Sequence, residues 1–191
     1  MRIVAGTARG RSLAGPKATS QHIRPTADRV RETLFNMLGQ FLDGQRVLDL
    51  YAGTGALGLE ALSRGAGHLV MVDQDREAQS LCRQNAEHLG FTAQSTLLAQ
   101  PVNRALELLA RQGERFEIVF ADPPYAARVV ESVLESVAKV VAPGGTVVVE
   151  HDKREPAPEA HAGLTQEDQR RFGDTLVTFY RAPAESPETI A

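Results

Sequence analysis

Residues 47–58 read Val47-Leu48-Asp49-Leu50-Tyr51-Ala52-Gly53-Thr54-Gly55-Ala56-Leu57-Gly58. The apolar run at the start predicts a strand that is buried on both faces, as in a parallel sheet. Gly53 and Gly55 permit a sharp turn and let a ligand approach the main chain closely. A helix expected over residues 56–63 would present free N–H groups to that ligand. This stretch therefore predicts a site for a nucleotide-type cofactor.

Two cofactors fit this layout. The spacing of Gly53, Gly55 and Gly58 matches the dinucleotide-binding fingerprint, with Asp73 placed about 20 residues later to hold a ribose. The same stretch, with Asp49 closing the strand before an Ala-Gly-Thr-Gly turn, resembles motif I of S-adenosylmethionine-dependent methyltransferases. An acid beside the loop disfavours a pyrophosphate, because two like charges would lie close together, but it suits an ammonium group.

Length and composition indicate one medium-sized globular domain. The chain has 191 residues, enough for a full core. No apolar run approaches the ~20 residues that a membrane span requires, and the N-terminus lacks the apolar core of a signal peptide, so we expect a cytoplasmic protein. The single cysteine, Cys82, excludes an intrachain disulfide, and no Cys/His cluster has metal-ligand spacing, so we expect no metal.

Charge is distributed unevenly along the chain. The first 46 residues carry eight Lys/Arg and three acids, whereas the remainder carries 13 basic and 21 acidic residues. Seven of the first eight basic residues are arginine, whose planar fork suits phosphate and base edges. A basic segment on an acidic body favours a polyanion-binding arm, although a solvated basic tail would look the same.

The order of the expected elements indicates an α/β protein. Residues 1–21 are expected to form a basic arm or hairpin, 22–181 the main domain, and 182–191 a disordered tail. Beyond the opening strand, strands are expected at 68–72, 96–99, 116–121, 146–150, 169–172 and 175–181. Helices are expected between a cap at Thr26 and a stop at Gly39, and at 76–89, 101–111 and 129–141. This alternation predicts a doubly wound, mainly parallel sheet with an antiparallel edge strand from the last hairpin.

The tetrapeptide Asp122-Pro123-Pro124-Tyr125 follows an apolar strand, so we expect it at the same sheet edge as the glycine turn. The two prolines fix the backbone and remove two N–H donors. The Asp122 carboxylate and a carbonyl of this turn can then accept both hydrogens of an exocyclic amine. Tyr125 offers a flat face on which a nucleobase can stack.

This arrangement favours methyl transfer to an aromatic amine. Such an amine is a poor nucleophile because its lone pair is delocalised into the ring. Holding both N–H bonds localises the lone pair toward a sulfonium methyl group. Methyl transfer is then an in-line displacement that is accelerated by positioning and electrostatics. A hydride-transfer enzyme linked to NAD has no use for an amine cradle. Asp122 or water takes the released proton.

These motifs together resemble the bacterial small-subunit ribosomal RNA guanine-N2 methyltransferases, RsmD type, over nearly the whole chain. The matching residues are Arg9-Gly10-Arg11, Arg24-Pro25-Thr26-x-x-Arg29-Val30-Arg31-Glu32-x-Leu34-Phe35-Asn36, Asp49-Leu50-Tyr51-Ala52-Gly53-Thr54-Gly55-Ala56-Leu57-Gly58-x-Glu60-Ala61 and Asp122-Pro123-Pro124-Tyr125. The resemblance implies a seven-stranded Rossmann-like methyltransferase fold, S-adenosylmethionine as cofactor, S-adenosylhomocysteine as product, and a guanine 2-amino group in 16S ribosomal RNA as acceptor.

The candidate site residues fall into three sets. Those assigned to the cofactor are Asp49, Ala52, Gly53, Thr54, Gly55, Asp73 and Gln100, those assigned to catalysis are Asp122, Pro123, Pro124 and Tyr125, and those assigned to RNA are Arg9, Arg11, Arg24 and Arg29. Gln100 departs from the family pattern, because Pro101 after it removes an N–H that the adenine ring could use. Arg24 and Arg29 could instead order the cofactor loop through Asp28 or Glu32.

Several functions remain open at this stage. The amine cradle serves adenine N6 in RNA or DNA as well as guanine N2. A noncatalytic RNA-binding factor for ribosome assembly could keep the same fold as a scaffold. For the guanine-N2 methyltransferase we expect ribosomal RNA, alone or within the small subunit, as the partner, and a monomer without membrane contact.

Overall fold

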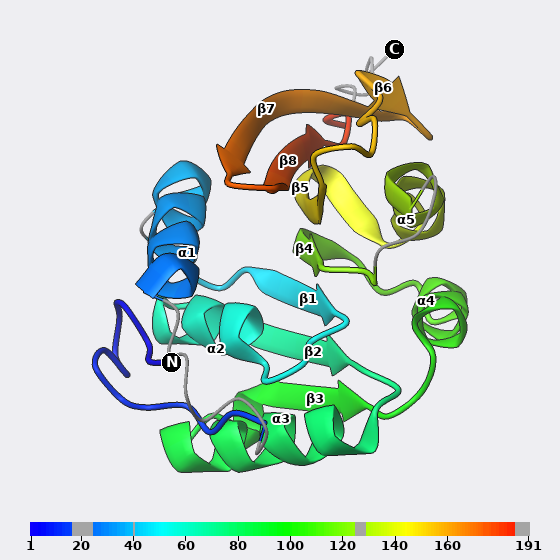
Figure 1. The fold of residues 1–191 in the computed structure, drawn as a ribbon. Coiled ribbons are helices and arrows are strands. Elements are labelled where there is room, and N and C mark those ends of the chain that lie inside the picture. The colour runs from blue at the N-terminus through cyan, green and yellow to red at the C-terminus, as the bar shows by residue number, and fades with distance from the viewer. Residues whose placement is uncertain (17–24, 40, 125–128, 186–191) are drawn as a thin grey trace. The chain divides into compact units, whose positions relative to one another are not determined.

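The computed structural model describes residues 1–16, 25–39, 41–124 and 129–185, and for residues 25–29 the backbone only. It forms two compact units, Met1–Ala105 and Leu106–Ala191 (Figure 1). Three predicted site residues, Tyr125, Arg24 and the side chain of Arg29, lie outside the described part. The same holds for residues 186–191 of the expected tail.

The first unit contains the parallel strands that the glycine motif predicts. Their order is β3 (Ser95–Leu98), β2 (His68–Val72), β1 (Arg46–Leu50), and both neighbouring pairs are parallel. Helix α2 (Ala56–Ser63) joins β1 to β2, and α3 (Arg76–Leu89) with the short η2 (Thr92–Gln94) joins β2 to β3. Helix α1 (Pro25–Leu38) precedes β1. It ends before Gly39 as expected, but it already includes Thr26, which was expected to cap it.

Helix α3 shows why local signals located the elements well. The Asp75 side chain accepts hydrogen bonds from the backbone N–H groups of Glu77 and Ala78, each at 2.9 Å. Gly90 ends the helix in the left-handed conformation, with φ of 81°. Both caps involve residues within a few positions of the helix end, so they can be read from the sequence.

The first 13 residues form the expected hairpin, which packs against α2 within the first unit. Arg2 and Ser12 face each other in an antiparallel bridge, and Leu13 N donates to Met1 O at 3.0 Å. At the hairpin tip, Thr7 N donates to Ser63 O at 2.7 Å. A Cβ on Gly6 would stand 1.7 Å from Ser63 O, and its φ is +81°, so only glycine fits this contact.

Glu60 on α2 is the centre of a buried charged cluster. Its carboxylate accepts from Val4 N at 2.7 Å, Ala5 N at 2.9 Å and Arg64 Nε at 2.9 Å. Arg31 from α1 lies at 3.8 Å through its Nε and donates through Nη2 to Arg2 O at 2.8 Å. Glu60 thereby joins the hairpin, α1 and α2.

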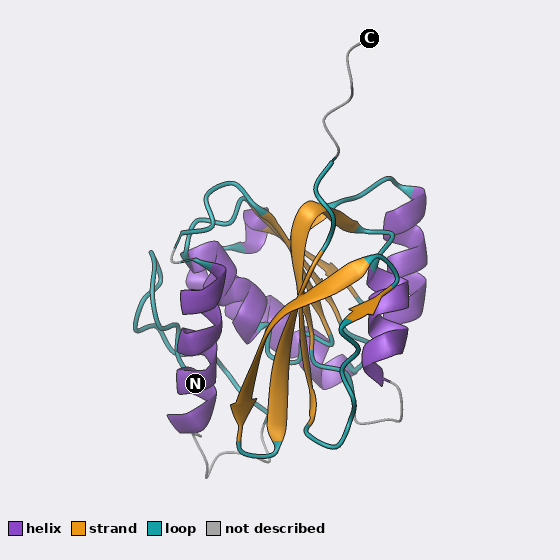
Figure 2. Ribbon diagram, turned by 90° about the horizontal axis from the view of Figure 1, so that it is seen from above, coloured by secondary structure: helices purple, strands orange, loops and turns teal. Residues whose placement is uncertain are grey.

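The second unit is more antiparallel than the sequence predicts. Its strand order is β4 (Phe116–Ala121), β5 (Val141–Asp152), β8 (Thr175–Arg181), β7 (Leu164–Phe172), β6 (Ala160–His161). Among its described residues, β4 and β5 pair in parallel and the other neighbouring strands pair antiparallel. The long antiparallel strands are strongly twisted (Figure 2). Helix α5 (Val129–Val137) packs on β5, and α4 (Val102–Arg111) spans the boundary of the two units.

Three expected elements of this unit have wrong bounds, one of them β7, which starts at Leu164 instead of Gln169. The helix expected over 129–141 ends at Val137, and β5 starts at Val141 instead of Thr146. The Pro143-Gly144-Gly145 sequence, which suggests a helix stop, lies inside β5, where the register with β4 shifts. The described residues form eight strands, whereas seven were expected, because β6 lies in what was interpreted as a loop.

We predict that Glu60→Gln lowers the free energy of unfolding by about 3–5 kcal/mol, because it leaves two buried arginines without their carboxylate. Urea denaturation measures the change. Glu87→Gln, on the exposed face of α3, is the matched control and should change stability by less than about 0.5 kcal/mol. A loss for Glu60→Gln as small as the control's would contradict a structural role for the cluster.

Candidate cofactor and methyl-transfer site

The residues assigned to the cofactor gather at the carboxyl edge of the first unit's sheet. Asp49 lies in β1, the glycine turn follows β1, Asp73 follows β2 and Gln100 follows β3. Ligands of α/β sheets bind beyond this edge. The structure links two of the predicted residues directly, since Gly53 N donates to Asp73 Oδ2 at 2.9 Å.

Asp49 is buried and binds the main chain that follows the turn. Its Oδ2 accepts a hydrogen bond from Gly58 N at 2.9 Å, inside the first turn of α2. A Cβ on Gly58 would stand 2.4 Å from Leu69 Cδ1 and 3.1 Å from Asp49 Oδ2. The third glycine of the motif therefore lets α2 pack closely on β2, and leaves the first two to shape the ligand side.

The turn has an unusual backbone. Gly53 and Gly55 have φ of 57° and 75°, and Tyr51 before them has φ of 59°. For a residue other than glycine the left-handed region costs about 1–2 kcal/mol. Two hydrogen bonds hold the curled chain: Gly55 N donates to Ala52 O at 2.7 Å, and Ala52 N donates to Val72 O at 3.1 Å. The positive φ of Tyr51 has no sequence signal.

Asn85 on α3 connects this turn to the N-terminal hairpin. It is buried, its Oδ1 accepts from Ala14 N at 2.7 Å, and its Nδ2 donates to Ala14 O at 3.1 Å and Thr54 O at 2.9 Å. The hydroxyl of Thr54 lies 3.8 Å from Met1 Sδ. The sequence alone did not single out Asn85, because its partners Ala14 and Thr54 are far away along the chain.

Cys82 packs against the turn in surroundings that disfavour its thiolate form. It is fully buried, and its Sγ donates to Gly53 O at 3.4 Å. Burial, followed by the charges of Asp49 and Asp73, raises the pKa of the thiol to about 12. Cys82 therefore packs as a small buried side chain.

Gln100 presents an unpaired amide at the same edge. Its Nε2 is buried and has no hydrogen-bond partner among the described residues. The backbone N–H of Gln100 donates to Leu98 O at 3.0 Å, so the unpaired donor belongs to the side chain. Because the oxygen and nitrogen of an amide can exchange places by a flip, Gln100 can offer either an acceptor or a donor to a ligand. Such an orphaned polar group fits a site for an adenine ring.

In the second unit, Asp122 follows β4 at the carboxyl end of the parallel β4–β5 pair. It remains accessible to solvent, yet surrounding protein atoms remove enough water to raise the pKa of its carboxyl group. Pro123 is buried and Pro124 is exposed. On the neighbouring strand, burial, and then the charge of Asp122, raise the pKa of Glu150 to about 7.

The arginines assigned to RNA have different surroundings. Arg9 is exposed on the hairpin, whereas Arg11 donates to the main-chain oxygens of His88 and, from Nη1 at 3.1 Å, Leu89. Arg11 therefore fastens the hairpin to the C-terminal end of α3, where a cation is favourable. Only its remaining N–H groups are free for another partner.

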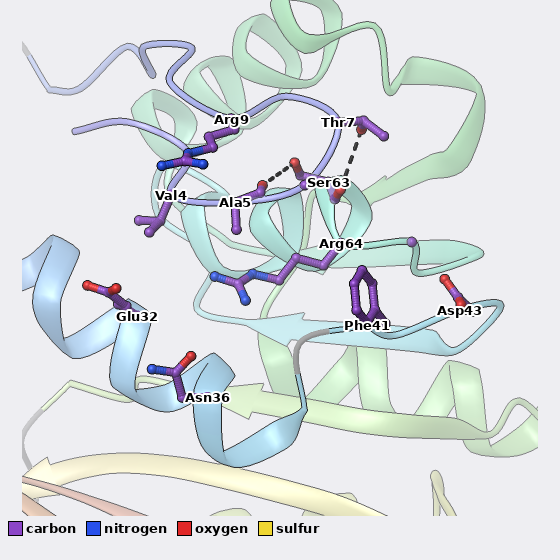
Figure 3. A pocket seen from close by; sticks show the side chains of 12 residues that line it. Val4, Ala5, Thr7, Arg9, Glu32, Asn36, Phe41, Asp43, Ser63 and Arg64 are labelled. Atoms are coloured by element: carbon purple, nitrogen blue, oxygen red, sulfur yellow. Dashed lines mark hydrogen bonds between the residues drawn. The ribbon is translucent and has the colours of Figure 1, made fainter.

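A pocket of about 500 Å³ opens beside Arg9 at the other end of the first unit's sheet, where residues 41–43 lead toward the start of β1. Figure 3 shows the hairpin, the Glu32 and Asn36 side chains of α1, and Phe41 around it. Phe41 is 77% exposed, an unusual state for an aromatic side chain. Glu32 and Asp43 give the pocket a mixed charge.

Within the described residues, no cluster of three or more His, Cys, Asp or Glu side chains could hold a metal ion. In the same part of the chain, no helix is both long enough and apolar enough to cross a membrane.

Known proteins resemble this chain over most of its length. The family model described as conserved hypothetical protein 95 matches residues 1–181. The Bacillus subtilis protein YlbH is 37% identical over 183 residues, which cover 95% of this chain and 98% of YlbH. The ribosomal RNA small subunit methyltransferase D of Escherichia coli strain K12 is 34% identical over 188 residues, 97% of this chain and 91% of the relative.

Solved structures extend the similarity to the fold. The Escherichia coli protein yhhF superposes with a TM-score of 0.82 at 32% identity, covering 97% of this chain and 99% of its own. SMU.776, solved in complex with S-adenosylhomocysteine, reaches 0.70 at 16% identity over 84% of this chain and 50% of that one, which is a likeness of fold alone. The expected Rossmann-like α/β fold is thus confirmed.

Proposed function

Because this chain belongs to the family described as conserved hypothetical protein 95, we propose that it is an S-adenosylmethionine-dependent ribosomal RNA methyltransferase. Its acceptor is the 2-amino group of a guanine in small-subunit RNA. The 34% identity with the small subunit methyltransferase D of Escherichia coli supports the RNA class. The observation that carries the chemistry is Asp122 followed by two prolines at the end of a parallel strand.

The first unit fits the cofactor. The curled turn offers main-chain N–H groups at the start of α2, where the helix dipole favours a carboxylate. Asp49 is assigned to the cofactor's ammonium group, Asp73 to the ribose hydroxyls, and Gln100 to the adenine. The unpaired amide of Gln100 and the half-exposed carboxylate of Asp73 support this assignment, since both are polar groups that face the carboxyl edge.

The second unit supplies the acceptor's cradle. The cofactor provides an electrophilic methyl group on a sulfonium. Asp122 and a main-chain carbonyl of the Pro123-Pro124 turn accept the two N–H bonds of the guanine amine, and Tyr125 is assigned to stacking on the base. The nitrogen forms the new N–C bond, the sulfur keeps the electron pair of the broken S–C bond, and the proton passes to Asp122 or water.

Mass mapping of nucleosides tests this proposal. Small-subunit particles lacking the modification are incubated with labelled S-adenosylmethionine and digested. Wild type should yield N2-methylguanosine, and Asp122→Ala should lower the rate at least about 100-fold, because the amine loses its acceptor. Calorimetry should show unchanged affinity of this variant for S-adenosylhomocysteine. Glu159→Ala, an exposed acid of the same unit, is the control and should keep full activity.

Other outcomes of these experiments would identify one of the alternative functions. N6-methyladenosine as the product would identify an adenine methyltransferase. RNA binding without any methylated product from wild type would favour an assembly factor. Binding of NAD in place of S-adenosylhomocysteine would identify an oxidoreductase.

For RNA, we propose that the face carrying Arg9 and Phe41 contacts the substrate. An exposed arginine can pair with a phosphate, and an exposed aromatic ring can stack on an unpaired base. Glu32 and Asp43 in the pocket repel a phosphate, so we assign the phosphate contact to the exposed Arg9. Such contacts position RNA and carry little sequence information.

Arg9→Ala should therefore weaken RNA binding and reduce the slope of log affinity against log salt by about one. Phe41→Ala should cost about 1–3 kcal/mol of binding with little change in the salt slope. Filter binding at several salt concentrations measures both. Arg83→Ala, on the exposed surface of α3, is the control; equal losses for Arg83 and Arg9 would mean that no specific face is used.

A further inference from the structure

Asp122 has a second carboxylate beside it. Strands β4 and β5 are parallel, with Ala121 opposite Val149, so the next residues along the two strands are Asp122 and Glu150. Residues at matched positions of neighbouring strands project to the same face, and the strands lie about 4.8 Å apart. Glu150 therefore stands next to the proposed amine acceptor at the carboxyl edge of this pair.

The surroundings of Glu150 leave its carboxylate unused. On the other side, β8 places Val177 opposite it, a buried apolar residue. The next residue in that row, Arg170 on β7, is paired with Asp168, and Asp152 on β5 is paired with Arg154. No described residue donates a hydrogen bond to the Glu150 side chain or forms an ion pair with it.

Such a group is costly to keep without a function. Glu150 is half-buried, so its ionised form has lost water without gaining a donor. Burial first, and the charge of Asp122 second, raise the pKa of Glu150 to about 7. Two neighbouring carboxylates with no cation between them suit a ligand that brings more than one N–H.

The two candidate bases differ at this point. Guanine carries its 2-amino group next to N1–H, so its Watson–Crick edge offers adjacent donors. Adenine carries its 6-amino group next to N1, which has a lone pair and no hydrogen. Once Asp122 holds the amine, the neighbouring ring nitrogen is the next group along that edge.

We propose that Glu150 accepts the N1–H of the target guanine and thereby selects guanine over adenine. This rests on the proposed function of the Asp122 site and supplies its base specificity. The ionised carboxylate attracts the N1–H of guanine and repels the N1 lone pair of adenine, so a single group both favours one base and disfavours the other. Glu150 is a specificity and positioning residue that does not touch the transferred methyl group.

The test compares Glu150→Gln with wild type and with the control Glu159→Gln on the same unmodified small-subunit particles. The variant should lose about 10- to 100-fold in kcat/KM for guanine, the value of a charge-assisted hydrogen bond. It should also raise the ratio of N6-methyladenosine to N2-methylguanosine, because a flipped amide can donate to adenine N1. Glu159→Gln should change neither quantity.

The pH profile separates this role from a purely structural one. Wild-type kcat/KM for guanine should fall as the pH drops through about 7, because Glu150 gains a proton and its charge is lost. Glu150→Gln should be flat over that range. Unchanged affinity for S-adenosylhomocysteine verifies that a variant is folded. Glu150→Asp, which keeps the charge, is the second variant if Glu150→Gln does not fold. It should retain the preference for guanine.

Each outcome has a separate meaning. If wild type makes N2-methylguanosine but Glu150→Gln keeps its base ratio and pH profile, this inference is overturned and the proposed function stands. Loss of the guanine preference in Glu150→Asp would overturn the inference in the same way. If wild type makes no methylguanosine, the proposed function falls first.

Discussion

Glu60 sits without solvent contact between two arginines and two main-chain amides of the N-terminal hairpin. Taking these charges out of water is expensive, and the cluster is tolerated because every neighbour returns an ionic or hydrogen-bonded contact. Arg64 adds a stacking contact, with its guanidinium carbon 4.6 Å from the centroid of the Phe35 ring. The helix that carries Glu60 is α2, which begins at the cofactor turn. The cluster therefore fixes the hairpin and α1 to the element on which the proposed cofactor site is built.

At the opposite end of α2 the conformation of the chain depends on close packing instead of charge. Gly58 admits a close approach to Leu69, and Gly55 lies where a side chain would meet Met71 Sδ at 2.9 Å. Asp73 then holds the curled backbone through Gly53 N, and Asp49 holds the first turn of α2 through Gly58 N. Each acid thus already has a structural role in the folded chain. The proposed ligand contacts would use further acceptor positions on the same carboxylates. A site prepared in this way spends little binding energy on ordering its loop.

Sequence reasoning succeeded where the signal was local. The caps of α3 and the buried strands of the first unit depend on residues close together in the chain, and their positions were predicted correctly. It failed where partners are distant: Glu60 meets Val4 across 56 positions, and Asn85 meets Ala14 across 71. The end of α5 and the beginning of β5 were predicted wrongly, because the glycines at 144 and 145 suit a β-bulge as well as a helix stop. Glu150 could not be singled out either, since only the sheet register places it beside Asp122.

We propose that the turn around Gly53 binds the cofactor and that Asp122 holds the guanine to which the methyl group is transferred. A crystal structure with S-adenosylhomocysteine and a guanine-containing RNA fragment measures this directly. We predict that the cofactor occupies the Gly53–Gly55 bend, with the guanine 2-amino nitrogen held by Asp122 and facing the sulfur across a gap that fits one methyl group. A bound cofactor with Asp122 turned away from both its sulfur and the base would contradict the account.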